Sequence, residues 1–125
     1  MNSEKGTSIK GKVIVAEYYD VGNTALLENE ELIRRELRLA LESAGATVYD
    51  VTSRKFGPGV TAVAIIGESH GSMHTWPEIA YARFLMDYYP NMRPYSAVRH
   101  LQDLLETSQE PIVQEMELGT KDYRS

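Results

Sequence analysis

The first half of the chain carries two hydrophobic patterns, which predict a β-strand followed by an α-helix. Residues 13–19 read Val-Ile-Val-Ala-Glu-Tyr-Tyr, an apolar run with aromatic residues that is typical of a buried strand. Between Glu28 and Ala44, apolar residues recur at helical spacing, and Gly45 provides a helix stop. The buried stripe of this predicted helix comprises Leu32, Ile33, Leu37, Ala40, Leu41 and Ala44.

A turn signal at residues 57–59, Gly-Pro-Gly, separates two segments that together predict a β-hairpin. Thr47–Phe56 precedes the turn, and the apolar run Val60–Ile66 follows it. Further along, apolar residues at helical spacing predict a second helix over Pro94–Leu105. The pattern of Ile112–Leu118 predicts a last strand.

The middle segment, residues 68–89, carries two conflicting local signals. Thr75-Trp76-Pro77-Glu78 has the form of a helix capping box with proline in the first turn, which favours a helix over residues 79–89. The same segment is rich in aromatic residues, which are typical of strands, and it lies between two predicted sheet elements. From local propensity alone we predict a helix.

Together these elements predict a single α+β domain that spans residues 1–125. No internal repeat and no long linker divides the chain. We expect helices to cover one face of a mostly antiparallel sheet. The other face would then be open, which favours dimerisation.

The composition excludes several classes of function. The 125 residues include no cysteine, which rules out disulfides, thiolate metal sites and thiol nucleophiles and favours an intracellular location. The net charge is −5, with no basic patch at either terminus, which argues against a nucleic acid partner. The apolar runs are too short to cross a bilayer, and the start lacks a signal-peptide pattern. We therefore predict a soluble, cytoplasmic protein with no membrane partner.

Residues 68–78 concentrate the side chains that are best able to carry chemistry, namely two histidines, two serines and two carboxylates. One interpretation is a metal site of His70, His74 and Glu78, but it needs a continuous helix, which a glycine and a proline in the segment disfavour. A second is a serine hydrolase, although the Gly-x-Ser-x-Gly elbow is absent. A third is a polar loop whose histidines bond to the backbone. We expect that this segment does not form a metal site.

The same segment, Glu-Ser-His-Gly-Ser-Met-His-Thr-Trp-Pro-Glu, resembles the small prokaryotic S-adenosylmethionine decarboxylase proenzymes. Lys55-Phe56, the turn after it and Gly59-Val60-Thr61 also fit that family, and the resemblance extends from Gly11 to about Leu118. It implies a two-layer α+β sandwich in which residues 79–89 form a strand, contrary to the local prediction. It also implies a homodimer of processed protomers with active sites near their interface.

Members of this family make their own cofactor, a pyruvoyl group, from a serine that Ser69 matches. The resemblance implies that the Ser69 hydroxyl attacks the Glu68 carbonyl to form an ester. β-Elimination then cleaves the chain into residues 1–68 and 69–125. The ketone left on residue 69 forms a Schiff base with an amino-acid-type substrate and serves as its electron sink. By the same resemblance, His74 handles protons during elimination and the Thr61 hydroxyl assists processing.

The spacing of Ser69 and His74 carries a geometric requirement. In a regular strand, two residues five positions apart point to opposite faces of the sheet. We therefore expect a bulge or a turn between them, and Gly71 is the residue best suited to provide it.

The resemblance also implies which residues contact the substrate. Glu78 matches a carboxylate that binds the ribose hydroxyls, and Phe56 matches an aromatic residue that stacks on adenine. Trp76 belongs to the same motif and is a third candidate for substrate binding. Tyr18 or Tyr19 is the candidate to lie opposite Phe56.

The chain departs from the family at the residue that returns a proton to the substrate. The family has a cysteine followed by a glycine at this position, where this chain has Tyr89 and Pro90. Because a phenol is a weaker acid than a thiol, Tyr89 or its neighbour Tyr88 is a less acidic substitute donor. Arg54 and Tyr95 are further departures, at positions where the family has histidine and tryptophan.

Three functions remain open at this point. The leading one is an S-adenosylmethionine decarboxylase of polyamine biosynthesis. The second is an ornithine or arginine decarboxylase that uses the same pyruvoyl group. The third is a non-catalytic regulatory paralogue, which the missing thiol suggests but the intact Ser69 and His74 argue against.

Overall fold

The computed structural model describes residues 10–121. The expected ends of the two fragments, at residues 1 and 125, therefore lie outside the described residues. In chain order, the elements of the described part are β1 (Gly11–Tyr18), η2 (Thr24–Glu28), α1 (Glu30–Ser43), β2 (Asp50–Phe56), β3 (Gly59–Ile65), β4 (His70–Trp76), η3 (Pro77–Ile79), β5 (Tyr81–Tyr88), α2 (Pro94–Leu105) and β6 (Ile112–Leu118), where η marks a 3-10 helix.

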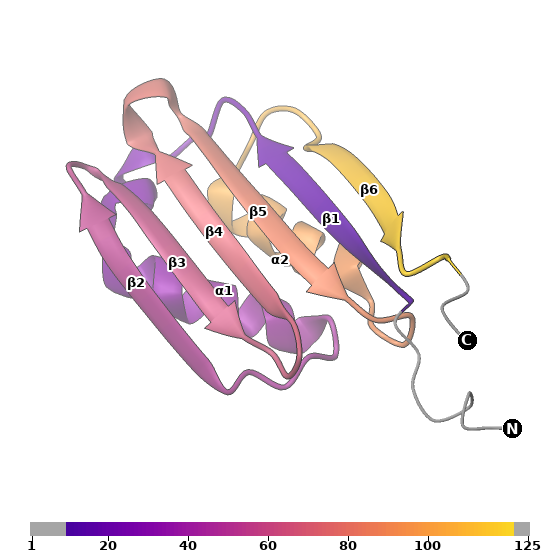
Figure 1. Ribbon diagram of the computed structural model, residues 1–125. Coiled ribbons are helices and arrows are strands. Elements are labelled where there is room, and N and C mark those ends of the chain that lie inside the picture. Colours follow the sequence, from indigo (N-terminus) through magenta and orange to yellow (C-terminus); the bar gives the residue numbers. More distant parts are fainter. Residues whose placement is uncertain (1–9, 122–125) are drawn as a thin grey trace, which may run out of the picture.

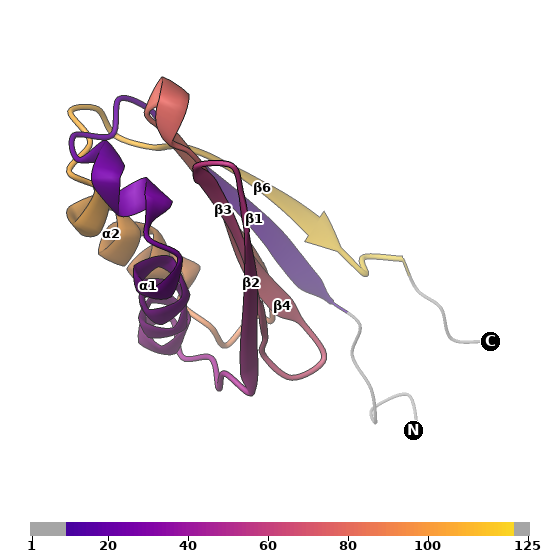
Figure 2. The ribbon, with the colours of Figure 1, turned by 90° about the vertical axis from the view of Figure 1, so that its left-hand side faces the viewer.

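The strands form one antiparallel sheet in the order β2-β3-β4-β5-β1-β6 (Figure 1). Figure 2 shows α1 and α2 on the same face of this sheet. The predicted fold class, a two-layer α+β sandwich, is confirmed. We call the sheet face opposite the helices the open face. Across residues 10–121, no helix is both long enough and apolar enough to cross a membrane.

The hydrophobic core lies between the sheet and the two helices. Alternate residues of each central strand point into it, as the two-residue period of a strand requires. From β1 and β5 come Ile14, Ala16, Tyr18, Ala82, Phe84 and Met86, and from the helices Ile33, Leu37, Leu41, Ala97 and Leu101, all fully buried. The Tyr18 hydroxyl donates a hydrogen bond to the Val98 carbonyl at 2.8 Å, which joins β1 to α2.

Helix α1 starts two residues later than the pattern predicted. Asn29 is its N-cap, because the Asn29 side chain accepts a hydrogen bond from the Leu32 amide at 3.0 Å. Glu28 belongs to the preceding 3-10 turn. At the other end, Gly45 adopts φ +92° and terminates the helix as predicted.

Residues 81–88 form a strand, so the helix predicted from local propensity is wrong and the strand implied by the family resemblance is confirmed. The capping-box sequence yields only the short turn η3, which ends at Ala80 with a left-handed φ of 52°. Every second residue from Ala82 to Tyr88 is buried against the helices. This alternating burial outweighs the helix signals that precede the segment.

Candidate functional site

Five polar side chains form a row that crosses the open face from β2 to β1. The cross-strand register pairs Arg54 with Thr61, Thr61 with His74, His74 with Arg83, and Arg83 with Glu17. All five alternate with residues that point toward the helices. Strand geometry therefore places a predicted processing pair, Thr61 and His74, between two arginines on the uncovered side of the sheet.

His74 is the central side chain of this row. Its Nδ1 atom lies 3.3 Å from the Thr61 hydroxyl oxygen, within hydrogen-bond distance. Partial burial of the imidazole, followed by the positive charge of Arg83, lowers the pKa of His74 below its ordinary value. A neutral imidazole accepts protons, so the surroundings of His74 suit the role of a base.

Next to His74, an aromatic and charged cluster surrounds Arg83. The Arg83 guanidinium carbon lies 5.1 Å from the centre of the Trp76 ring, and its Nε donates a hydrogen bond to the Tyr81 hydroxyl at 3.0 Å. The Tyr81 hydroxyl in turn donates to a Glu17 carboxylate oxygen at 2.7 Å. The Tyr19 ring packs against Tyr81 at 5.0 Å between ring centres. Arg83 is therefore fixed on one face of the indole.

Arg83, Tyr81 and Glu17 do not stand out in the sequence as candidate site residues. The helix expected over residues 79–89 concealed the alternation of apolar even-numbered residues with polar Arg83 and Asp87. If the segment is a strand, this alternation places the apolar even-numbered residues on the helix side of the sheet and Arg83 on the open face. A period of two was thus the signal that would have found it.

The predicted substrate-binding residues lie at one end of the sheet. Phe56 is 62% exposed at the tip of the β2–β3 hairpin, and Trp76 and Glu78 lie where β4 passes into η3. The two regions are adjacent, because a Cβ atom added to Gly59 would lie 2.4 Å from the Thr75 carbonyl oxygen. Tyr18 is not opposite Phe56, since it is fully buried in the core.

Ser69 and the peptide bond expected to be cleaved lie at the other end. Glu68 belongs to a tight turn between β3 and β4, in which the Ile66 amide donates to the Ser69 carbonyl at 3.0 Å. Gly67 in this turn has φ +90°, a conformation that glycine tolerates best. Glu68 is exposed, whereas Ser69 is only 8% exposed and its hydroxyl donates a hydrogen bond to the Asp87 carbonyl in β5.

Tyr89 lies beside this turn, and Tyr88 does not. Partial burial raises the pKa of Tyr89, and the nearby negative charges of Glu68 and Asp87 raise it further. Tyr88 points toward the helices and donates to Glu115 at 2.9 Å, so it is removed from the open face.

The structure thus keeps Ser69 and His74 apart within one chain. Strand β4 pairs in an unbroken register with β3 and β5, without the bulge that we expected near Gly71. Five residues of extended chain span about 16 Å. The glycine has another purpose: a Cβ atom at residue 71 would lie 2.7 Å from Leu41 of α1, so Gly71 permits close packing of helix and strand.

The alternative chemistries lack their required geometry. The metal alternative needs one helical face, but His70 and His74 lie on a strand, and residues 10–121 contain no group of three or more histidine or carboxylate side chains suited to hold a metal. The hydrolase alternative needs a histidine on the serine hydroxyl, which here donates to a backbone carbonyl.

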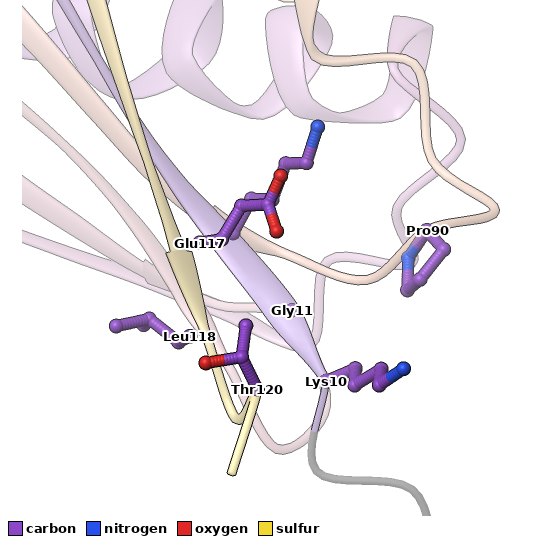
Figure 3. A pocket seen from close by; sticks show the side chains of 7 residues that line it. Lys10, Gly11, Pro90, Glu117, Leu118 and Thr120 are labelled. Carbon is purple, nitrogen blue, oxygen red and sulfur yellow. The ribbon is translucent and has the colours of Figure 1, made fainter.

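Two hollows near the site differ in their capacity for a ligand. The one shown in Figure 3 lies between the start of β1, the end of β6 and Pro90, and its 190 Å³ is below the range of about 300 to 1,000 Å³ typical of small-molecule sites. A groove of 370 Å³ on the open face falls within that range. It is lined by Val13, Val15, Glu17, Arg83, Leu85, Gln114, Glu115 and Met116.

Fold and site together define a class of protein: a two-layer α+β domain with a buried serine directly after an exposed turn and a histidine–threonine pair on the open face. Comparison with known proteins supports a specific family. The S-adenosylmethionine decarboxylase family model matches residues 12–117. The S-adenosylmethionine decarboxylase proenzyme of Thermotoga maritima is 37% identical over 106 residues, which cover 83% of this chain and 81% of the relative.

A second relative and a solved structure agree. The proenzyme of the same name from Methanococcus aeolicus is 37% identical over 107 residues, covering 82% of this chain and 89% of the relative. The crystal structure of the adenosylmethionine decarboxylase from Aquifex aeolicus matches with a TM-score of 0.80 at 26% identity, covering 95% of this chain and 98% of that one. The chain belongs to the S-adenosylmethionine decarboxylase family, a family of carboxy-lyases. The resemblance drawn from residues 68–78 is confirmed.

Proposed function

We propose that this chain is a pyruvoyl-dependent decarboxylase of polyamine biosynthesis that acts on S-adenosylmethionine after it cleaves itself between Glu68 and Ser69. The observation that carries the proposal is the position of Ser69: its peptide bond to Glu68 lies in an exposed turn, while its side chain is buried and hydrogen-bonded. This combination of an accessible scissile bond and a nucleophile fixed by a hydrogen bond is what we expect of a serine that cleaves its own chain.

Formation of the pyruvoyl group requires only residues of this chain and one water molecule. The Ser69 Oγ bonds to the Glu68 carbonyl carbon, the carbon–nitrogen bond breaks, and the hydroxyl proton passes to the Ser69 nitrogen. A base then removes the proton on the Ser69 Cα, and the Cβ–oxygen bond breaks to release Glu68 as a carboxylate. Water replaces the nitrogen, which leaves as ammonia. His74, whose pKa is lowered by burial and by Arg83 and whose Nδ1 lies 3.3 Å from the Thr61 hydroxyl, is suited to be that base.

The pyruvoyl group would form at residue 69. When this group is present, its ketone supplies the electron sink for loss of carbon dioxide from the substrate. Phe56 and Trp76 offer aromatic surface for the adenine, and the exposed Glu78 carboxylate can accept hydrogen bonds from ribose hydroxyls. Tyr89 is the proposed donor of the proton that the substrate α-carbon requires. Because its pKa is raised, we expect proton return to be slower than from a thiol.

We further propose that the enzyme is a homodimer whose sites combine both protomers. Ser69 lies at one end of the sheet and His74, with the substrate-binding residues, at the other. If two open faces pack with their strands antiparallel, the Ser69 end of one protomer meets the His74 end of its partner. Apolar side chains on the open face, among them Val63, Leu85 and Met116, would be covered by the same contact.

A mixing experiment tests the composite site. A Ser69→Ala chain and a His74→Ala chain should each stay intact alone. In a mixed dimer, Ser69 of the His74→Ala chain meets the intact His74 of its partner, so that chain alone should cleave. Mass spectrometry distinguishes the two chains. Failure to cleave in the mixture, together with cleavage of the wild-type chain, would locate the site within one protomer.

A second candidate function is supported by the contact between Arg83 and Trp76. The guanidinium covers one face of the indole that would otherwise be free for adenine. This arrangement favours a smaller amino acid, ornithine or arginine, decarboxylated through the same pyruvoyl group.

Two measurements separate the candidates. Intact mass shows whether the purified chain is one species or two fragments with a blocked residue at position 69; an uncleaved chain leaves only the regulatory paralogue. Release of carbon dioxide from S-adenosylmethionine, ornithine and arginine, compared side by side, then identifies the substrate.

A further inference from the structure

The open face of β5 carries a basic, an apolar and an acidic side chain in succession. Arg83, Leu85 and Asp87 share this face because they alternate with the buried, even-numbered residues of the strand. Arg83 is exposed, while Leu85 and Asp87 are half-buried. Strand β5 is one of the two central strands of the sheet (Figure 1). The middle of the open face therefore has opposite charges on either side of an apolar residue.

Neither of these charges has an ionic partner in the part of the chain that the structure describes. No ion pair in that part includes Arg83 or Asp87. Glu17 faces Arg83 across β1, but its carboxylate accepts a hydrogen bond from the Tyr81 hydroxyl instead. On the same strand, the residue that faces Asp87 is the apolar Val13. A surface that covered these two charges would have to bring an opposite charge to each.

A second copy of the chain supplies both opposite charges when two open faces pack with their strands antiparallel. A two-fold axis that crosses β5 at Leu85 lays this strand over its counterpart in the reverse direction. Arg83, two residues before the axis, then meets the partner's Asp87, two residues after it. Packed sheets lie about 10 Å apart, a gap that the long arginine side chain can bridge to a carboxylate. The order of charges along β5 is thus complementary to itself.

We propose that two copies of this chain associate in the register that pairs Arg83 of each protomer with the partner's Asp87, on either side of a central contact between the two Leu85 side chains. This inference rests on the proposed function and specifies the register of its homodimer. Because β5 is central, the angle of about 30° between packed sheets displaces its residues less than those of the edge strands.

The two ion pairs join the separated ends of the candidate site. The Asp87 carbonyl accepts the hydrogen bond of the Ser69 hydroxyl, and Arg83 lies directly opposite His74 in the sheet. Each ion pair therefore brings the serine end of one protomer to the histidine end of the other. The same contacts that select a second copy of this chain also assemble the two composite sites.

Charge reversal in two separate chains tests this register. Both chains also carry Ser69→Ala, so that they stay intact and the test does not depend on cleavage. In its homodimer, Arg83→Asp places two carboxylates opposite each other at both contacts, and Asp87→Arg places two guanidinium groups there. Each variant alone should raise the dissociation constant of the dimer at least about tenfold in sedimentation analysis.

Mixing the two variants should restore the dimer. Each contact of the mixed dimer again joins an arginine to an aspartate, so its dissociation constant should return close to that of the Ser69→Ala parent. Native mass spectrometry identifies the mixed dimer by its mass. Because a misfolded chain would not regain binding in the mixture, restoration also shows that both variants are folded.

Two exposed residues of α2 provide the matched control. Arg99→Asp and Asp103→Arg make the same changes of charge, at the same spacing of four residues, in the helix layer. These variants should form dimers as tight as those of the parent, both separately and mixed.

The outcomes distinguish this inference from the proposed function. If the parent is a dimer but the reversals do not weaken it, or the mixture does not restore it, this register is overturned while the proposed homodimer stands. A monomeric parent would overturn the register and the homodimer together. Cleavage of the wild-type chain and release of carbon dioxide would still decide whether the chain is a decarboxylase.

Discussion

His74 and Arg83 occupy directly opposed positions on β4 and β5, on the open face of the sheet. A permanently charged guanidinium next to an imidazole disfavours the protonated imidazole. Thr61 faces His74 from β3, with Arg54 beyond it on β2, while Glu17 lies beyond Arg83 on β1. Within this row, the carboxylate of Glu17 is thus separated from His74 by the arginine.

Replacing Arg83 with glutamine should move the pH dependence of self-cleavage. His74 must be neutral to accept a proton, and its pKa is lowered by burial and by Arg83. Without Arg83 the pKa rises, so His74 becomes protonated at a higher pH. The acid limb of the cleavage profile should therefore shift to higher pH, as followed by intact mass between pH 5 and 8. Arg99→Gln on α2 removes the same charge from the helix layer and should leave the profile in place.

The hydroxyl of Thr61 should matter more than its methyl group. Thr61→Val keeps the shape of the side chain but removes the contact with His74 Nδ1, and should slow self-cleavage about fivefold to tenfold. Thr61→Ser keeps the hydroxyl and should cleave at close to the wild-type rate. Equal rates for valine and serine, measured by the same mass assay, would show that the Thr61 hydroxyl takes no part.

A charge in the middle of the open face should prevent dimer formation. Leu85→Asp places a carboxylate among apolar neighbours on β5, where a second sheet would bury it, and should weaken the dimer by at least about tenfold in sedimentation analysis. Thr52→Asp adds the same charge in the same cross-strand row, but on the edge strand β2, and is the matched control. If both variants remain dimeric, the protomers associate through another surface.

Gly71 should be intolerant of a side chain, for reasons of packing. Gly71→Ala brings a methyl group to 2.7 Å from the fully buried Leu41, which should lower the free energy of unfolding by about 1 to 3 kcal/mol. In the Leu41→Ala background the added methyl group has room, so the second substitution should cost much less there. Denaturant unfolding of the four chains measures this coupling. Additive losses would mean that the two residues do not compete for space.

Much of the fold was predictable because its strongest patterns are local. The stripe of Leu37 and Leu41 and the stop at Gly45 define α1 with no knowledge of the rest of the chain. The segment from Tyr81 to Tyr88 was not predictable in this way. Its capping-box sequence yields only the short η3, whose N-cap Trp76 makes no capping hydrogen bond with its side chain. The alternation that identifies the strand has meaning only once a layer of helices exists to bury alternate residues.

The candidate site, too, was predictable only where the information is local in the sequence. Residues that lie in one motif, such as Ser69, His74 and Trp76, could be named from the sequence. Their distances could not, because an unbroken register sends Ser69 and His74 to opposite ends of the sheet. Arg83, Tyr81 and Glu17 come from two strands far apart in sequence, and their contacts exist only through the pairing of β1 with β5.

The order of strands has a consequence for a chain cut after Glu68. The first fragment carries β1, α1, β2 and β3, and the second carries β4, β5, α2 and β6. In the sheet, β3 pairs with β4, and β1 is inserted between β5 and β6 (Figure 1). The two fragments are therefore interlocked along three strand pairings, and neither can leave without opening the sheet on both sides of β1. A cut after Glu68 would change the covalent structure of the protein but leave its two pieces as one folded body.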